Sequence, residues 1–246
     1  MAGIWVYADV KAGGKVDPSA LELLTKARDL DGDVAAVALG PGATEAAQAL
    51  GEHGAATVYA SDDEVYGEFI GQPAAHAVHE LVKEHQPSLI LFGLTYDSRD
   101  VAGRLQALTG STLMSNATDV LGADRAQTQI FGGTRIVDVQ LEGPDPKLVL
   151  VRPKSFPAEP SGGQANVVPV NVEVPEELKK ARRVERHEEE TSGPVAVRLG
   201  TALRERLGLA AEVLLAGPGE LPRTEVGKAR RVIRWEGGDP PLPGLV

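Results

Sequence analysis

The sequence contains no cysteine, few aromatic residues and no long apolar run. Without cysteine, the 246-residue chain can form neither a disulfide nor a thiolate metal site, which favours a reducing compartment such as the cytoplasm. No apolar run approaches the ~20 residues that a membrane-spanning helix needs, and residues 1–10 lack the charged and apolar regions of a signal peptide. These absences predict a soluble cytoplasmic protein that does not insert into a membrane.

The net charge of -10 at pH 7 argues against nucleic acid as a partner. The charge is unevenly distributed, because residues 195–246 carry eight Lys/Arg and six Asp/Glu, a net of +2, which leaves -12 for the rest. The C-terminal segment therefore differs in character from what precedes it.

Short apolar runs alternate with amphipathic helical patterns along the first two thirds of the chain. The helix expected at 17–30 has Asp17 as its N-cap and Pro18 at its first position. The apolar runs predict buried parallel strands at 3–10, 33–40, 56–61 and 88–94, with further helices at 43–54, 69–86 and 98–110. Four closely spaced strands around 117–121, 128–131, 136–141 and 147–151 are expected to be partly antiparallel. This pattern predicts an α/β fold with helices on both faces of a mainly parallel sheet.

A glycine-containing turn at 40–44 is the first candidate for ligand binding. Gly40, Gly42 and Thr44 lie between a strand and a helix N-terminus, where free N–H groups can bind phosphate. The alternative is a simple connection in which Thr44 caps the helix.

The second candidate is the loop at 93–100, which follows a buried strand. The carboxyl end of such a strand is the usual position of a ligand crevice, so Asp97, Ser98 and Arg99 are candidate cofactor-binding residues. Ser98 or Asp100 capping the next helix explains the same residues equally well.

Other polar clusters are interpreted structurally. His76, His79 and His85 with Glu80 lack the spacing of a zinc helix, so we expect surface histidines and no metal site. The charge-rich stretch 175–190 is expected to be a solvated helix or linker.

Three segments resemble the N-terminal domain of the electron transfer flavoprotein alpha subunit. They are DPSALELLTKARDL at 17–30, the stretch from LILFGLTYDSRD to SNATDV at 89–120, and LVLVRPKSFPAEP at 148–160. The resemblance extends to about residue 194, where SGP usually closes that domain. One departure is that Gln129 and Ile130 stand where the family usually has an Arg-Pro pair.

The resemblance implies a three-layer α/β domain of the adenine-nucleotide-hydrolase-like kind. It also implies a heterodimer with a beta-type subunit that carries electrons through FAD from dehydrogenases, such as those of fatty acid oxidation, to a quinone reductase. In the family, FAD is held mainly by a second domain of the alpha subunit, and AMP by the partner subunit. The Gly-rich, Arg-containing turn of that second domain is absent here, so we expect this chain alone to catalyse nothing and not to retain FAD. The alternative is a non-redox α/β module that binds a partner or an adenylate.

Residues 195–246 resemble the C-terminus of phenylacetate-coenzyme A ligases. In those enzymes the lysine of LPRTEVGKARRV, here Lys228, stabilises the charge that develops during adenylation. The ligase body has no counterpart in this sequence, so Lys228 is either a catalytic candidate or a solvated basic turn, and an acyl-coenzyme A ligase fragment is the third functional hypothesis. The expected domains are 1–157, an extended arm and charged linker at 158–194, and the ligase-like tail at 195–246.

Overall fold

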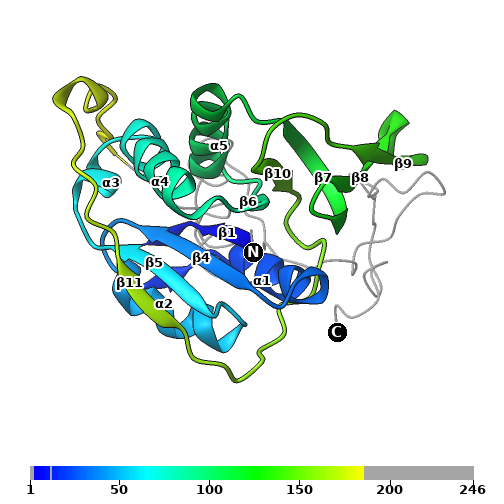
Figure 1. Cartoon of the computed structure of the whole chain (residues 1–246), viewed down its shortest axis with the longest axis horizontal. Coiled ribbons are helices and arrows are strands. Elements are labelled where there is room, and N and C mark those ends of the chain that lie inside the picture. Colours follow the sequence, from blue (N-terminus) through cyan, green and yellow to red (C-terminus); the bar gives the residue numbers. More distant parts are fainter. Residues whose placement is uncertain (1–2, 12, 186–246) are drawn as a thin grey trace, which may run out of the picture. The chain divides into compact units, whose positions relative to one another are not determined.

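The computed structural model describes residues 3–11 and 13–185 (Figure 1). The predicted ligase-like tail, including Lys228, lies outside the described residues. The described part of the chain forms one nine-stranded sheet and a small two-stranded sheet made of β2 (Val10–Lys11) and β3 (Lys15–Val16).

The nine-stranded sheet has the order β11-β5-β4-β1-β6-β10-β7-β8-β9. Its strands are β1 (Ile4–Ala8), β4 (Val34–Leu39), β5 (Thr57–Ser61), β6 (Leu89–Gly93), β7 (Leu113–Gly122), β8 (Arg125–Ile130), β9 (Arg135–Gln140), β10 (Lys147–Val151) and β11 (Asn166–Pro169). From β11 to β7 every neighbouring pair is parallel. The pairs β7–β8 and β8–β9 are antiparallel, which confirms the predicted partly antiparallel end of the sheet.

Helices cover both faces of the parallel part of the sheet. The helices are α1 (Pro18–Leu30), α2 (Ala43–Glu52), α3 (Val65–Glu68), α4 (Gln72–His85) and α5 (Tyr96–Thr109). Buried residues of α1 and α2 pack with Val6 and Leu91 on one face, and those of α4 and α5 pack with Tyr7 and Phe92 on the other. Alternate residues of β1 and β6 therefore serve two separate cores, so both strands are apolar throughout. The predicted three-layer α/β fold is confirmed.

The N-terminal caps of the helices agree with the sequence prediction in one case and differ in two. The Asp17 carboxylate accepts from the Ser19 amide at 3.0 Å, as predicted for α1. Helix α2 has Gly42 as its N-cap with no side-chain cap, so the prediction that Thr44 caps it was wrong. Helix α5 is capped by Thr95, whose hydroxyl accepts from the Ser98 amide at 3.0 Å, which corrects the prediction of Ser98 or Asp100.

The expected extended arm contains a strand that the sequence analysis missed. Strand β11 pairs in parallel with β5 at the edge of the sheet. The Asn166 amide donates to the carbonyl of the residue before β5 at 2.9 Å, and the Val170 amide donates to a carbonyl of β5 at 2.8 Å. The backbone nitrogen of Pro169, at the alternate position, therefore faces the open edge. Because proline has no N–H to offer there, it weakens this edge as a template for another strand.

Within its described part, the charge-rich stretch forms only a short 3-10 turn at Glu176–Leu178, so the predicted helix is not formed there. His85 is exposed, as predicted for a surface histidine, and its ring lies 4.8 Å from that of Tyr59 and 6.0 Å from that of Trp5. Within the described residues, no helix is both long and apolar enough to span a membrane.

Candidate functional site

The topology of the sheet points to the carboxyl ends of β1 and β6. After β1, the chain places β4 and β5 successively on one side of β1, and β6 then lies on the other side. In an open α/β sheet, ligands bind where the direction of strand order reverses in this way. The residues that leave β1 and β6 at this point are Asp9 and the loop Leu94–Thr95.

Asp9 is the centre of a hydrogen-bonded cluster at this position. Its Oδ2 accepts hydrogen bonds from the Thr95 hydroxyl and, at 2.9 Å, from the Ser98 hydroxyl. Burial raises the pKa of Asp9 to about 6; the two hydroxyl donors lower it in part, and the nearby Asp97 and Asp17 raise it further. Thr95 therefore both caps α5 and holds the carboxylate of Asp9. No sequence motif marked Asp9, because its partners lie 86 and 89 residues away.

A second carboxylate in this region is paired with an arginine from the C-terminal end of the described chain. The Arg183 guanidinium donates to Asp97 Oδ2 at 3.0 Å and to the Gly67 carbonyl at 2.8 Å. Backbone hydrogen bonds from Ile70 to Ala181 and from Arg183 to Glu68, both 2.8 Å, fix the segment 181–183 against 67–70. We call residues 181–183 the strap. The sequence predicts a solvated Arg183, whereas the structure makes it part of this site.

Tyr7 lies among the same charges, at the end of β1. Burial raises its pKa well above the ordinary value, and the negative charges of Asp9 and Asp97 add to this effect, whereas Arg183 opposes it. Its ring packs at 5.4 Å from the ring of Phe92 on β6. The site thus contains two carboxylates, of Asp9 and Asp97, and the guanidinium of Arg183. These groups lie near the packed rings of Tyr7 and Phe92.

The structure brings two of the three residues predicted in the 93–100 loop to this site. Asp97 and Ser98 contribute the contacts described above. Arg99 is exposed, and the contact recorded for it is with the ring of Tyr96, 6.0 Å from the guanidinium carbon. Tyr96 itself is 89% exposed.

The predicted phosphate-binding turn at Gly40–Thr44 is occupied by a side chain of the protein itself. The Thr44 amide donates to Asp62 Oδ1 at 3.1 Å. The pKa of Asp62 is lowered mainly by hydrogen bonding with Thr44, and the nearby backbone of Gly42 and Ala43 adds to this effect. The Thr44 amide is therefore directed at a carboxylate of the chain, and the amides of Gly40 and Ala43 donate to the carbonyls of Ser61 and Gly40 at 2.8 and 3.0 Å.

Gly42 shows why this turn also has little room. Its φ is 91°, and a Cβ there would lie 2.5 Å from the Gly14 amide nitrogen. The turn requires glycine because the backbone of the loop between β2 and β3 packs directly against it.

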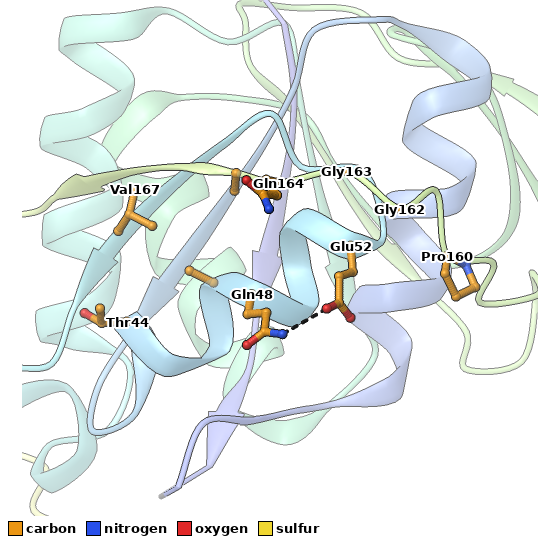
Figure 2. A pocket seen from close by; sticks show the side chains of 10 residues that line it. Thr44, Gln48, Glu52, Pro160, Gly162, Gly163, Gln164 and Val167 are labelled. Atoms are coloured by element: carbon orange, nitrogen blue, oxygen red, sulfur yellow. Dashed lines mark hydrogen bonds between the residues drawn. The ribbon is translucent and has the colours of Figure 1, made fainter.

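A separate groove of about 600 Å³ lies between α2 and the segment 160–167 (Figure 2). Thr44, Gln48 and Glu52 line it from one side of α2, and Gln48 Nε2 donates to Glu52 Oε1 at 3.0 Å. The opposite wall is formed by 162–165, next to which the amides of Ser161 and Gly162 donate to the Glu52 carbonyl. Among the described residues that line it, the groove offers one carboxylate and no cation, so it does not suit an anionic ligand. Within the described residues there is no cluster of three or more metal-ligating side chains.

Comparison with known proteins identifies the family. The sequence profile of the electron transfer flavoprotein domain matches residues 4–177, and the chain belongs to this family. It is 33% identical over 183 residues to the electron transfer flavoprotein subunit alpha of Mycobacterium tuberculosis, covering 74% of this chain and 56% of that protein. It is 30% identical over 209 residues to the lactate dehydrogenase (NAD(+),ferredoxin) subunit LctC of Acetobacterium woodii, covering 77% of this chain and 50% of the relative. The chain thus spans about half the length of these curated relatives.

The family name implies a flavin, so we asked whether the described polar sites suit the pyrophosphate of FAD. Such a group needs free amides or cations. At the β1–β6 crevice, Asp9 takes both hydroxyl donors, and the Arg183 charge is paired with Asp97. At the 40–44 turn, the Thr44 amide donates to Asp62, and the amides of Gly40 and Ala43 donate to backbone carbonyls. These two sites do not fit a dinucleotide phosphate.

Proposed function

We propose that this protein is an alpha-type subunit of an FAD-dependent electron carrier whose described domain serves as a scaffold and not as the flavin site. In this proposal the carrier accepts electrons from dehydrogenases and delivers them to a quinone reductase. The family match over residues 4–177 supports the alpha-type assignment. The observation that carries the scaffold role is the filling of both predicted ligand sites by Asp9, Asp97 and Asp62 of the chain itself.

The proposed partner is a beta-type electron transfer flavoprotein subunit, which would carry AMP. The relatives are named as subunits, which supports a multi-subunit assembly for this chain. The cysteine-free sequence supports a reducing compartment, and we place the carrier in the cytoplasm on that ground. The domain boundaries at 157 and 194, and the ligase-like tail with Lys228, remain predictions.

A second candidate function is a non-redox adenylate-binding module. The observation that favours it is the exposed ring of Tyr96 at the carboxyl end of β6, where it could stack on a base. The carboxylates of Asp9 and Asp97 oppose it, because they would repel the phosphate of an adenylate.

Co-expression separates the two candidates. We expect the chain to co-purify with a beta-type subunit encoded in the same genome as a stable heterodimer on size-exclusion chromatography. We also expect calorimetric titration of the isolated chain with AMP to give no saturable binding. Saturable AMP binding that is lost in Tyr96→Ala, together with no heterodimer, would establish the adenylate-binding module instead.

A further inference from the structure

The β8–β9 hairpin ends in three exposed apolar side chains. Ile130 and Ile136 project from opposite faces of the hairpin, because Ile130 lies opposite Arg135 and Ile136 lies opposite Gln129. Ile130 is 37% exposed, Phe131 76% and Ile136 63%. We call these three residues the hairpin tip. They come from the end of β8, from the turn Phe131–Gly133 and from the start of β9. Figure 1 shows the hairpin at the end of the sheet opposite β11, extending away from α4 and α5.

The backbone of the tip is strained at Phe131, whose side chain is mostly exposed. Phe131 has φ 51°, a left-handed conformation that a bulky side chain rarely adopts. Gly132 and Gly133 follow with φ 65° and 92° and take up the rest of the turn. An aromatic ring that is held at positive φ and remains mostly exposed gains little packing within this domain. Such strain persists where it serves a function.

The hairpin is otherwise made of polar, internally satisfied pairs. Gln127 donates to Asp138 at 2.7 Å, Arg125 pairs with the same carboxylate at 3.5 Å, and Gln140 donates to Asp124 at 2.7 Å. The apolar residues at the tip therefore differ from the rest of the hairpin, whose surface is polar and solvent-exposed. Exposed apolar side chains at the end of an otherwise polar hairpin are typical of a binding surface for another protein.

The charge next to the tip indicates the chemistry of the partner. Arg152 at the end of β10 donates to Asn116 Oδ1 at 2.6 Å and to Gln129 Oε1 at 3.4 Å. Both acceptors are neutral amide oxygens, so they fix the guanidinium without cancelling its charge. Gln129 is directly opposite Ile136 in the β8–β9 register, which places this cation beside the tip. Arg135, exposed on β9, adds a second positive charge.

We propose that the hairpin tip inserts into an apolar pocket with an acidic rim on the partner subunit. The proposal rests on the proposed function, since it assigns a surface of this chain to that assembly. A second copy of this chain fits less well, because a two-fold contact would bring the same tip, with Arg135 and Arg152, against itself. The partner's rim supplies carboxylates to these two cations, and its pocket receives Phe131.

The test compares binding of the beta-type subunit by the full-length chain, by a double variant of the hairpin tip and by a control variant. Phe131→Gly removes the ring and suits the positive φ, and Ile136→Thr removes an exposed apolar group but keeps a residue that favours strands. We expect the double variant to bind at least tenfold more weakly by calorimetry, with a thermal midpoint no lower than that of the wild type. Leu108→Gln on α5, at a position that is 50% exposed, is the matched control and is expected to bind like the wild type.

A charge variant supplies a second readout. Arg135→Gln is expected to weaken binding and to reduce its dependence on salt between 50 and 300 mM (about a sixfold range that changes screening strongly). Wild-type affinity in the double variant, in a chain that does bind the partner, would overturn the role of the tip alone. A wild-type chain that binds no beta-type subunit would overturn the proposed function and this inference together. Dimers of the chain alone that disappear in the double variant would assign the tip to self-association and so overturn the proposal.

Discussion

At the residue scale, Asp9 is an example of a site residue that could not be predicted from the sequence. Asp17 and Pro18 predict the start of α1, because an N-cap and a first-turn proline are local signals that lie within a few residues of each other. Asp9 has no such local signature, since Thr95 and Ser98 reach it only after β1 and β6 become neighbours. The error over the cap of α5 has a similar origin. Thr95, Ser98 and Asp100 are all capping residue types, and the hydroxyl of Ser98 is taken by Asp9.

The raised pKa of Asp9 makes a prediction about stability and pH. With a folded-state pKa of about 6, against an ordinary value of 3.8, the folded protein binds this proton more readily than the unfolded chain does. The contribution of Asp9 to stability therefore falls as the pH rises from about 4 to 6. Asp9→Asn keeps an oxygen acceptor for Thr95 and Ser98 but carries no charge. We expect the variant to be more stable than the wild type at pH 7.5, by on the order of 1 to 3 kcal/mol.

Urea unfolding at pH 7.5 and pH 5 measures this effect. The difference between Asp9→Asn and the wild type should shrink at the lower pH, whereas Asp29→Asn at an exposed position of α1 should show no such change. A difference that grows on acidification would show that Asp9 is stabilised as a carboxylate, contrary to our account.

At the scale of elements, the parallel strands and four main helices were predictable, and β11 and the strap were not. Continuous apolar strands and amphipathic helices can be predicted from the local periodicity of their apolar residues. Strand β11 contains only four residues and ends in Pro169. A stretch this short shows no clear alternating pattern, and its proline argues against a strand. The sequence does not reveal the role of Arg183, because its partners, Gly67 and Asp97, are 116 and 86 residues away.

Two glycines at helices α4 and α5 give opposite predictions for the same substitution. Gly71, the N-cap of α4, has φ 62°, and a Cβ there would lie 1.7 Å from Asp100 Oδ2, which is paired with Arg104. Gly71→Ala should cost about 2 kcal/mol or more through backbone strain and displacement of this pair. Gly103 is exposed within α5, and beyond the backbone of its own helix a Cβ there would meet no heavy atom within 4 Å. Gly103→Ala should stabilise by about 0.5 to 1 kcal/mol.

Thermal and urea unfolding of these two variants provide the measurement. Equal effects of the same sign would mean that the close approach between Gly71 and Asp100 does not exist in solution. The comparison also tests the packing of α4 against α5, because Asp100 and Arg104 belong to α5.

At the scale of the whole molecule, the family assignment and the filled ligand sites support one account. The domain has the predicted three-layer α/β fold and a family match over residues 4–177, yet polar groups of both predicted ligand sites form hydrogen bonds with carboxylates of the chain itself. Among the described residues that line the groove beside α2, Glu52 is the charged one and there is no cation. The described domain therefore has the features of a scaffold, and its exposed hairpin tip has those of a contact surface.

The most direct test of this account is the absorbance spectrum of the full-length chain, purified alone and together with a beta-type subunit, after incubation with FAD and removal of free flavin. We predict that the chain alone is colourless and that it binds the beta-type subunit. A stoichiometric flavin band in the chain purified alone would contradict the account.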